Sequence, residues 1–377
     1  MNRHFSRLSA CLLCMALAIP EAVLAQTPAS DRGLGLDGLY FPSVRYTFTE
    51  FERATTYLDV AGLPRTVNAL IRVPTGAPRP LPVVIWSHGG ARGKENPRKS
   101  LAEWSIVTAE AGFLTVSIAH TPREAPPAGD SRRRLCQALV PPLDDAACKV
   151  FKHLSWDRPH DIRAVVDALE RMNAQGELRG QIDVLRIAVG GHSAGSGGAL
   201  MVAGALRKFG GAPVDLSDPR PVAFLAFSPQ QPGSDGFFDT GFKNAEHSWK
   251  YITRPVLVAT GDGDSTCKPG VEPGSCIGET PFGRRIAFAR MPSGSKYHLY
   301  VHDESAFHTL FALGTSKCAL PRIDVDQRKC DEIARWLESA ALAFLDGHVR
   351  GDALALEWLR SDNTVAASRS VVEWLTK

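Results

Sequence analysis

Short apolar runs alternate with longer amphipathic stretches along the chain. The apolar runs are rich in β-branched residues and lie at 81–86, 113–119, 187–189, 222–227 and 255–260. Runs of this length and composition are typical of strands that are buried on both faces of a parallel sheet. Nearer the N-terminus, residues 44–49, 55–60 and 67–73 predict an antiparallel edge to that sheet.

Amphipathic stretches separate these runs. In residues 159–173 the apolar side chains share one stripe of a predicted helix, and they are Ile162, Val165, Val166, Leu169 and Met172. Pro159 suits the first turn of this helix. Residues 329–344 repeat the pattern, and residues 101–111 show a weaker form of it. The alternation predicts an α/β fold, with a mostly parallel central sheet and helices on both faces.

Two long segments interrupt the alternation, at 122–156 and at 228–250. Both follow the carboxyl end of a predicted strand, where open α/β sheets bind their ligands. Segments of this length are commonly lids or walls of a binding site. The alternative for each is a surface insertion that has no contact with substrate.

The composition fits one large folded domain. The chain has 377 residues, of which 44% are hydrophobic, and 43 Lys and Arg against 40 Asp and Glu give a formal net charge of +3. These values exclude a disordered polymer and a strongly basic nucleic-acid binder. No Ser/Gly-rich or Pro-rich linker divides the chain, so we expect a single domain over residues 26–377.

Residues 1–25 have the pattern of a secretory signal peptide. Arg3 and Arg7 precede an apolar run at 11–19 that is too short to span a bilayer, and small residues near Ala25 suit a cleavage site. The quartet at 8–11 resembles a lipoprotein box, but it lies before the apolar run, so a lipid anchor is not expected. No apolar run of about 18 residues follows Ala25, and we expect a secreted or periplasmic protein without membrane insertion.

Six cysteines remain after the predicted signal peptide. They form three couples that are close in sequence, namely Cys136 with Cys148, Cys267 with Cys276 and Cys318 with Cys330. Export to an oxidising compartment predicts that each couple is a disulfide. Free thiols are the alternative, and zinc is not expected because no couple has the spacing of two to four residues between zinc ligands.

A candidate nucleophile lies directly after the predicted strand at 187–189. The segment GGHSAG at 190–195 fits the pattern G-x-S-x-G around Ser193 and precedes a stretch at 196–208 that can be helical. In this pattern the serine occupies a strained turn between strand and helix, where flanking side chains would collide with the backbone. The helix that follows directs its positive end at the serine. A structural turn with no chemistry is the alternative.

A candidate acid follows the predicted strand at 255–260. The segment GDGD at 261–264 offers two carboxylates, and Asp264 is favoured because the chain has room to turn inward after Gly261. Asp262 would instead face the turn backbone or solvent. The alternatives are a simple Asx-turn or a calcium loop, and the latter lacks the glycine and the final glutamate of that motif.

The general base is expected later in the chain, in the order Ser, acid, His. The candidates are His298, His302, His308 and His348. His298 and His302 lie within or just beyond a predicted strand at 296–301. His308 follows that strand, in a loop that leads into an apolar helical segment, and this position favours it as the base.

Two backbone N–H groups are predicted to bind the oxyanion. The strand at 81–87 leads into His88-Gly89-Gly90, where backbone without side chains can approach a substrate. We expect the N–H groups of Gly90 and Ala194 to converge on the substrate's carbonyl oxygen. His88 and His192 are expected to be structural hydrogen-bonding residues.

Together these motifs resemble the α/β-hydrolase superfamily over residues 81–308. The segment SHGG at 87–90, with WDRPHDIR at 156–163, resembles the platelet-activating-factor acetylhydrolase and dienelactone-hydrolase-like esterases. The resemblance implies a triad of Ser193, His308 and Asp264. Dienelactone hydrolases use a cysteine where this chain has Ser193, so their lactone substrate is not expected. The cysteine-bearing insertion at 122–156 has no counterpart in the resemblance.

The predicted function is that of an exported serine hydrolase. It would cleave a small-molecule or polymeric carboxylic ester through an acyl-enzyme, with no metal or organic cofactor. Cleavage of activated carbon–carbon bonds, such as those of β-diketones, is an alternative reaction. A non-catalytic binding protein with the same fold is the alternative from another class, and it would require a broken triad. The near-neutral charge predicts no nucleic-acid partner.

Overall fold

The computed structural model describes residues 32–35, 37–90, 96–123, 131–209, 212–232, 248–266, 279–315, 318 and 325–377. The predicted signal peptide at 1–25 and most of the segment at 228–250 lie outside these residues. Residues 32–377 belong to one compact unit.

The strands are β1 (Arg32–Leu34), β2 (Tyr40–Pro42), β3 (Phe48–Leu58), β4 (Pro64–Pro74), β5 (Leu81–Ser87), β6 (Leu114–Ala119), β7 (Ile182–His192), β8 (Arg207–Phe209), β9 (Ala212–Val214), β10 (Pro221–Phe227), β11 (Val256–Gly261), β12 (Lys296–Val301) and β13 (Val372–Thr376). The α-helices are α1 (Ala102–Glu110), α2 (Ser131–Ala138), α3 (Asp145–Val150), α4 (His153–Gln175), α5 (Ala194–Ala203), α6 (Pro281–Arg290), α7 (Gln327–Leu345), α8 (Ala353–Trp358) and α9 (Asn363–Ala367).

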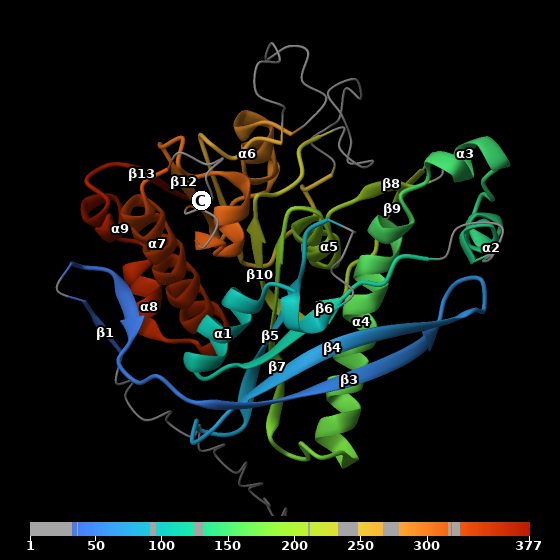
Figure 1. Cartoon of the computed structure of the whole chain (residues 1–377), viewed down its shortest axis with the longest axis horizontal. Helices are drawn as coiled ribbons and strands as arrows, with labels where there is room; N and C mark the ends of the chain where they lie inside the picture. Colours follow the sequence, from blue (N-terminus) through green and yellow to red (C-terminus); the bar gives the residue numbers. More distant parts are fainter. Residues whose placement is uncertain are drawn as a thin grey trace, which may run out of the picture. The chain divides into compact units, whose positions relative to one another are not determined.

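A nine-stranded sheet forms the centre of this unit, in the order β13-β12-β11-β10-β7-β5-β6-β4-β3 (Figure 1). The six strands from β12 to β6 pair in parallel, and β13, β4 and β3 are antiparallel to their neighbours. The chain runs from β5 outward to β6 and then returns to β7 on the other side of β5. Loops after β5 and β7 therefore diverge, and such a switch point is where open α/β sheets bind ligands.

Helices pack against the sheet in two groups, each with its own hydrophobic core. Alternate residues of β5 divide between the cores, because Val83 and Ile85 pack with α4 and α5, whereas Val84 and Trp86 pack with α1 and α7. This alternation explains why the parallel strands are apolar throughout: both faces are covered. The predicted α/β class with a mostly parallel, helix-flanked sheet is confirmed.

Several predicted boundaries were wrong. The segments at 44–49 and 55–60 are not separate strands. Residues 48–49 and 55–58 are the two ends of one 11-residue strand, β3, which forms a long hairpin with β4, and residues 44–47 are not in a strand. The helix expected at 159–173 begins at His153, so that Pro159 is inside α4 and not in its first turn. The helix expected at 196–208 already ends at Ala203, because Gly204 adopts a left-handed conformation with φ of 119°.

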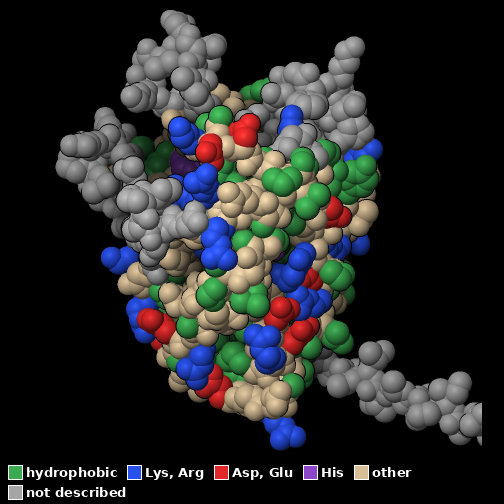
Figure 2. Space-filling view, turned by 90° about the vertical axis from the view of Figure 1, so that its right-hand side faces the viewer, with side chains coloured by type: hydrophobic (Ala, Val, Ile, Leu, Met, Phe, Trp, Pro, Cys, Tyr) green, Lys and Arg blue, Asp and Glu red, His purple; other side chains and the backbone are tan. Residues whose placement is uncertain are grey.

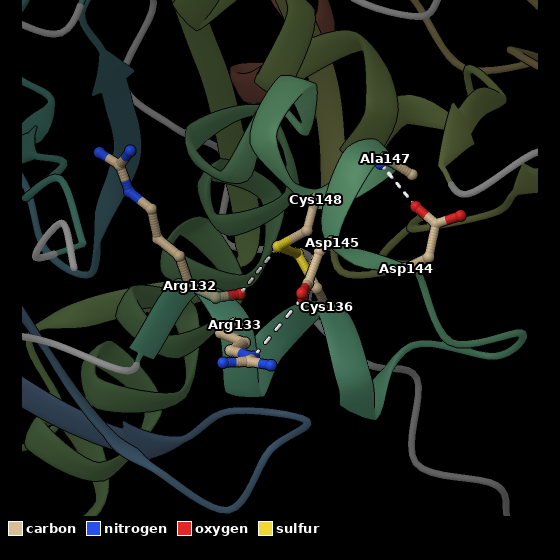
Figure 3. The surroundings of a disulfide bond; sticks show 7 residues. All are labelled: Arg132, Arg133, Cys136, Asp144, Asp145, Ala147 and Cys148. Carbon is tan, nitrogen blue, oxygen red and sulfur yellow. Dashed lines mark hydrogen bonds and ion pairs between the residues drawn. A yellow bond between two sulfur atoms is a disulfide. The ribbon is translucent and has the colours of Figure 1, made fainter. Parts of the chain in front are cut away.

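The predicted insertion at 122–156 contains two short helices, α2 and α3, joined by a disulfide between Cys136 and Cys148 (Figure 3). Asp144 caps α3 by accepting a hydrogen bond from the backbone N–H of Ala147 at 2.8 Å. A second disulfide joins Cys318 to Cys330. These two predicted couples are confirmed, and the couple Cys267–Cys276 lies outside the described residues.

The surface carries charges of both signs. Figure 2 shows Lys and Arg side chains interspersed with Asp and Glu on the face that it presents. This mixture agrees with the formal net charge of +3. Within the described part of the chain, no helix combines the length and the apolar character needed to cross a bilayer.

Candidate active site

Ser193 occupies a tight turn between β7 and α5. Its backbone has φ of 54° and ψ of −124°, a strained conformation for a residue with a side chain. The flanking glycines are required by space, since a Cβ on Gly191 would lie 2.3 Å from the carbonyl carbon of Gly195, and a Cβ on Gly195 would lie 1.9 Å from the carbonyl oxygen of Ser87. The G-x-S-x-G pattern therefore allows the turn to pack against the end of β5.

The loop after β5, residues 88–90, lies against the same turn. A Cβ on Gly89 would lie 2.7 Å from Cβ of Ser193, so only glycine fits beside this serine. Gly90 has open space around it but a φ of 68°, which favours glycine for conformational reasons. The loop that was predicted to bind the oxyanion is thus next to Ser193.

Asp264 and His308 form a hydrogen-bonded pair at the ends of neighbouring strands. Nδ1 of His308 lies 2.8 Å from Oδ1 of Asp264. The carboxylate accepts, so Nδ1 carries the proton and Nε2 is left as the acceptor that a general base needs. Thr260 donates to the other carboxylate oxygen at 2.7 Å, and Asp264 is fully buried. The buried acid is therefore held in one orientation.

Arg284 of α6 pairs with the carboxylate of Asp264, and no motif in the sequence singled this arginine out. Its Nε lies 3.0 Å from Oδ1 of Asp264, and the same guanidinium donates to the backbone oxygens of Ser228 and Pro229. Burial alone would raise the pKa of the Asp264 carboxyl, but the hydrogen bond from His308 and the charge of Arg284 outweigh it and hold the pKa below its ordinary value.

His308 lies beside the nucleophile turn. The ring of His192, the residue before Ser193, has its centroid 4.5 Å from that of His308, and His192 Nε2 donates to the backbone oxygen of His308 at 2.8 Å. The side chain of His308 is 20% exposed, so solvent or substrate can reach it. His192 is thus a hydrogen-bonding residue, as predicted, and it holds the segment that begins η5 (His308–Ala312).

The two predicted oxyanion donors belong to different elements. Ala194 is the first residue of α5, where helix geometry leaves the N–H without an intrahelical acceptor. Gly90 belongs to the loop after β5. The N-terminal end of α5 also brings its positive dipole end to this position.

The remaining candidates lie elsewhere. Asp262 accepts a hydrogen bond from the hydroxyl of Tyr300 at 2.6 Å, and His302, 47% exposed, lies 3.1 Å from Glu373. His298 is buried in β12 and stacks on Phe288, and His348 is bonded to the hydroxyl of Tyr297 at 3.0 Å. Of the four candidate histidines, His308 is the one whose hydrogen bond, among those of the described residues, is to Asp264.

A second Ser–His–Asp alignment was missed by the sequence analysis. Ser87 lies 2.8 Å from Nε2 of His120, whose Nδ1 lies 2.9 Å from Asp161, and all three side chains are fully buried. Arg65 of β4 makes two further bonds to the same carboxylate, at 2.7 and 2.8 Å. Burial lowers the pKa of His120 to about 4 despite its bond to Asp161. With no exposed atom, this alignment stabilises the end of β5 and has no access to substrate.

These residues together offer a hydroxyl, an imidazole oriented by a carboxylate, and backbone N–H groups that can donate to a negative oxygen. This set suits nucleophilic attack on an acyl carbon. Among the residues that the structure describes, no group of three or more His, Cys, Asp or Glu side chains is arranged to hold a metal ion.

The amino-acid sequence was also compared with known proteins. No protein-family model matches the chain, and no curated protein matches it either.

Proposed function

We propose that this chain is an exported serine esterase with the α/β-hydrolase fold, in which Ser193, His308 and Asp264 hydrolyse carboxylic esters. One observation carries the proposal: the buried carboxylate of Asp264 is bonded to Nδ1 of His308, and the ring of His308 packs on the residue that precedes the strained Ser193. The three residues follow three parallel strands of the sheet, β7, β11 and β12, in the chain order Ser, Asp, His that supports this proposal.

In the proposed reaction, Ser193 Oγ attacks the ester carbonyl while Nε2 of His308 takes its proton. Asp264 stabilises the imidazolium that forms, and the N–H groups of Ala194 and Gly90 bind the oxygen as it becomes negative. The imidazolium then gives its proton to the departing alcohol. Water attacks the acyl-enzyme by the same route, and Ser193 is regenerated.

Two features outside the triad support the fold and the export. The nucleophile and the loop 88–90 follow β7 and β5, the neighbouring strands at which the chain reverses direction across the sheet. The disulfides Cys136–Cys148 and Cys318–Cys330 are consistent with an oxidising compartment.

Covalent labelling tests the nucleophile. A fluorophosphonate is expected to label the native protein at one residue, Ser193, and to abolish hydrolysis of p-nitrophenyl esters. Ser193→Ala should lose both labelling and ester turnover while keeping its melting temperature. If native protein is not labelled, or if the label persists in Ser193→Ala, the proposal is wrong.

The base is tested by a pair of histidine substitutions. His308→Asn should lower ester turnover by about 10³-fold or more, because no imidazole is then available to take the proton of Ser193. His302→Asn is the matched control, since this histidine lies beside Glu373 and not beside Asp264. If the loss of turnover follows His302 instead, the base has been assigned to the wrong residue.

A further inference from the structure

Arg158 is a buried arginine whose guanidinium reaches the loop 88–90. It lies in α4, is 2% exposed, and donates one hydrogen bond to the backbone oxygen of His88 and another, of 2.5 Å, to that of Gly90. Its stem passes Gly198 of α5, where a Cβ would lie only 3.1 Å from Cβ of Arg158. A glycine on the nucleophile helix thus leaves room for this side chain.

The backbone oxygen of Gly89, which lies between those of His88 and Gly90, is bound by the side chain of His88. Nε2 of His88 accepts a hydrogen bond from the backbone N–H of His120 at 3.1 Å, so the proton of the neutral ring is on Nδ1. That nitrogen lies 3.1 Å from the backbone oxygen of Gly89 and donates to it. Three consecutive carbonyl groups of the loop are therefore each bound by a side chain.

Binding of the carbonyl groups also sets the direction of the N–H groups. In a trans peptide unit the N–H points opposite to the C=O of the preceding residue. The bond from His88 to the oxygen of Gly89 therefore orients the N–H of Gly90, and the bonds from Arg158 fix the peptide units on either side. A loop with two adjacent glycines has no comparable restraint of its own.

We propose that Arg158, together with His88, is a positioning residue that holds the loop 88–90 with the N–H of Gly90 directed at the oxyanion. This inference rests on the proposed function. The planar guanidinium is suited to the task because its two terminal nitrogens can donate to two carbonyl oxygens at once. Arg158 acts through the backbone of the loop and does not touch the substrate.

The test compares Arg158→Met with Arg254→Met. Arg254 also donates to backbone oxygens, those of Val202, Asp218 and Pro221, but at the start of β10, which is the opposite end of the strand from the site. We expect Arg158→Met to lower kcat by about 100-fold with little change in KM, because donors displaced by about 1 Å lose their effect mainly in the transition state. Arg254→Met should keep the native kcat.

Inhibition by a trifluoromethyl ketone supplies the second measurement, since its adduct with serine carries an oxyanion. Affinity for this inhibitor should fall in Arg158→Met in proportion to kcat/KM and stay native in Arg254→Met. Fluorophosphonate labelling counts the folded sites in each variant. If Arg158→Met does not fold, Arg158→Lys is measured instead, because it keeps the charge but loses the planar fork, and the same loss of kcat is expected.

Native kcat and inhibitor affinity in a folded Arg158 variant would overturn the inference and leave the proposed function standing. So would a loss that appears in KM alone. A native protein that neither labels nor hydrolyses esters would instead overturn the proposed function, and this inference with it.

Discussion

At the scale of single residues, the site depends on close approaches that only glycine permits. Gly195 and Gly89 lie where a Cβ would meet the carbonyl oxygen of Ser87 and the Cβ of Ser193. Ser193 itself pays a conformational cost, since its φ is positive. Gly195 and Gly89 are therefore required because a side chain would collide with neighbouring atoms, whereas other glycines of the chain are favoured because their φ is positive.

Gly195→Ala is expected to destabilise the fold by more than about 3 kcal/mol, because its Cβ would lie 1.9 Å from a backbone oxygen that cannot move away. Gly180→Ala is the matched control. Gly180 has a φ of 70° but nothing within 4 Å of a Cβ, so the cost should be about 1–2 kcal/mol of backbone strain. Urea unfolding of both variants measures the difference, and equal losses would contradict this explanation.

Arg284 should influence the pH dependence of the reaction. Its charge is one of the causes that hold the pKa of Asp264 below the ordinary value, and the carboxylate is needed in its ionised form. In Arg284→Met the pKa of Asp264 rises, so activity is lost at a higher pH as the solution is acidified. We expect the acid limb of the kcat/KM profile to move upward and kcat at pH 7 to fall about tenfold or more.

Arg220→Met is the control for this profile. Arg220 also pairs with carboxylates, those of Asp218, Asp167 and Glu170, but next to the start of β10. Its removal should leave the acid limb unchanged. An unchanged limb in Arg284→Met as well would show that this arginine has no influence on the protonation of the acid.

At the scale of secondary-structure elements, a disulfide ties the segment that carries His308 to α7. Cys318 follows η5 after a short connection, and Cys330 lies in the first turn of α7. Both cysteines are almost fully buried. This cross-link restrains the chain after His308, and the hydrogen bond from His192 restrains the carbonyl group of His308 itself.

Removal of this disulfide by Cys318→Ser with Cys330→Ser should cost about 3 kcal/mol of stability and lower kcat, because the segment that carries His308 is then held less firmly. The pair Cys136→Ser with Cys148→Ser provides a match in loop length, since both disulfides span 12 residues. Similar losses of stability are expected, measured by thermal unfolding. An unchanged kcat in the first variant at a temperature where it is folded would contradict the restraint on His308.

The elements could be predicted from the sequence where the pattern is local. Apolar runs located the parallel strands, and the stripe from Ile162 to Met172 located α4. The start of α4 was missed because Pro159 suggested a first turn. The helix begins earlier, at His153, where Trp156 and the preceding Phe151 pack on Phe209. Tertiary contacts of this kind leave no periodic signal in the chain.

At the scale of the whole molecule, several fully or partly buried histidines have lowered pKa values. Burial lowers the pKa of His120, His153 and His348 to about 4, and that of His298 to about 3. The pKa of an unfolded histidine is about 6.5. Between these values the unfolded chain binds more protons than the folded one, so stability is present above pH 6.5 and is lost as the pH falls toward 4.

We therefore expect the melting temperature to fall steeply between pH 6.5 and 4. In His298→Phe one proton fewer should be taken up on unfolding, so the pH dependence should be flatter. A phenyl ring can occupy the place of this imidazole, because His298 stacks on Phe288 and lies beside the tilted ring of Tyr300. Thermal unfolding at a series of pH values measures the slope. A slope that is the same in both proteins would mean that His298 does not take up a proton on unfolding.

In the candidate site, too, the residues marked by a local sequence pattern could be predicted, and those defined by contacts distant in sequence could not. Ser193, Asp264 and His308 each follow a strand, so their positions at one edge of the sheet could be predicted from sequence order alone. Arg158 and Arg284 could not, because their partners lie 68–70 and 20–56 residues away and are met only after the helices pack. Nothing in the spacing of these arginines distinguishes them from surface charges.

The long edge strand β3 affects how copies of the molecule meet. It is the last strand of the sheet, so one row of its backbone groups faces outward, where another chain could add a strand. The charged side chains of β3 include Glu50, Glu52 and Arg53, and the two glutamates pair with Arg98. Charges along an exposed strand oppose strand addition, so this border of the sheet disfavours edge-to-edge association of copies of the chain.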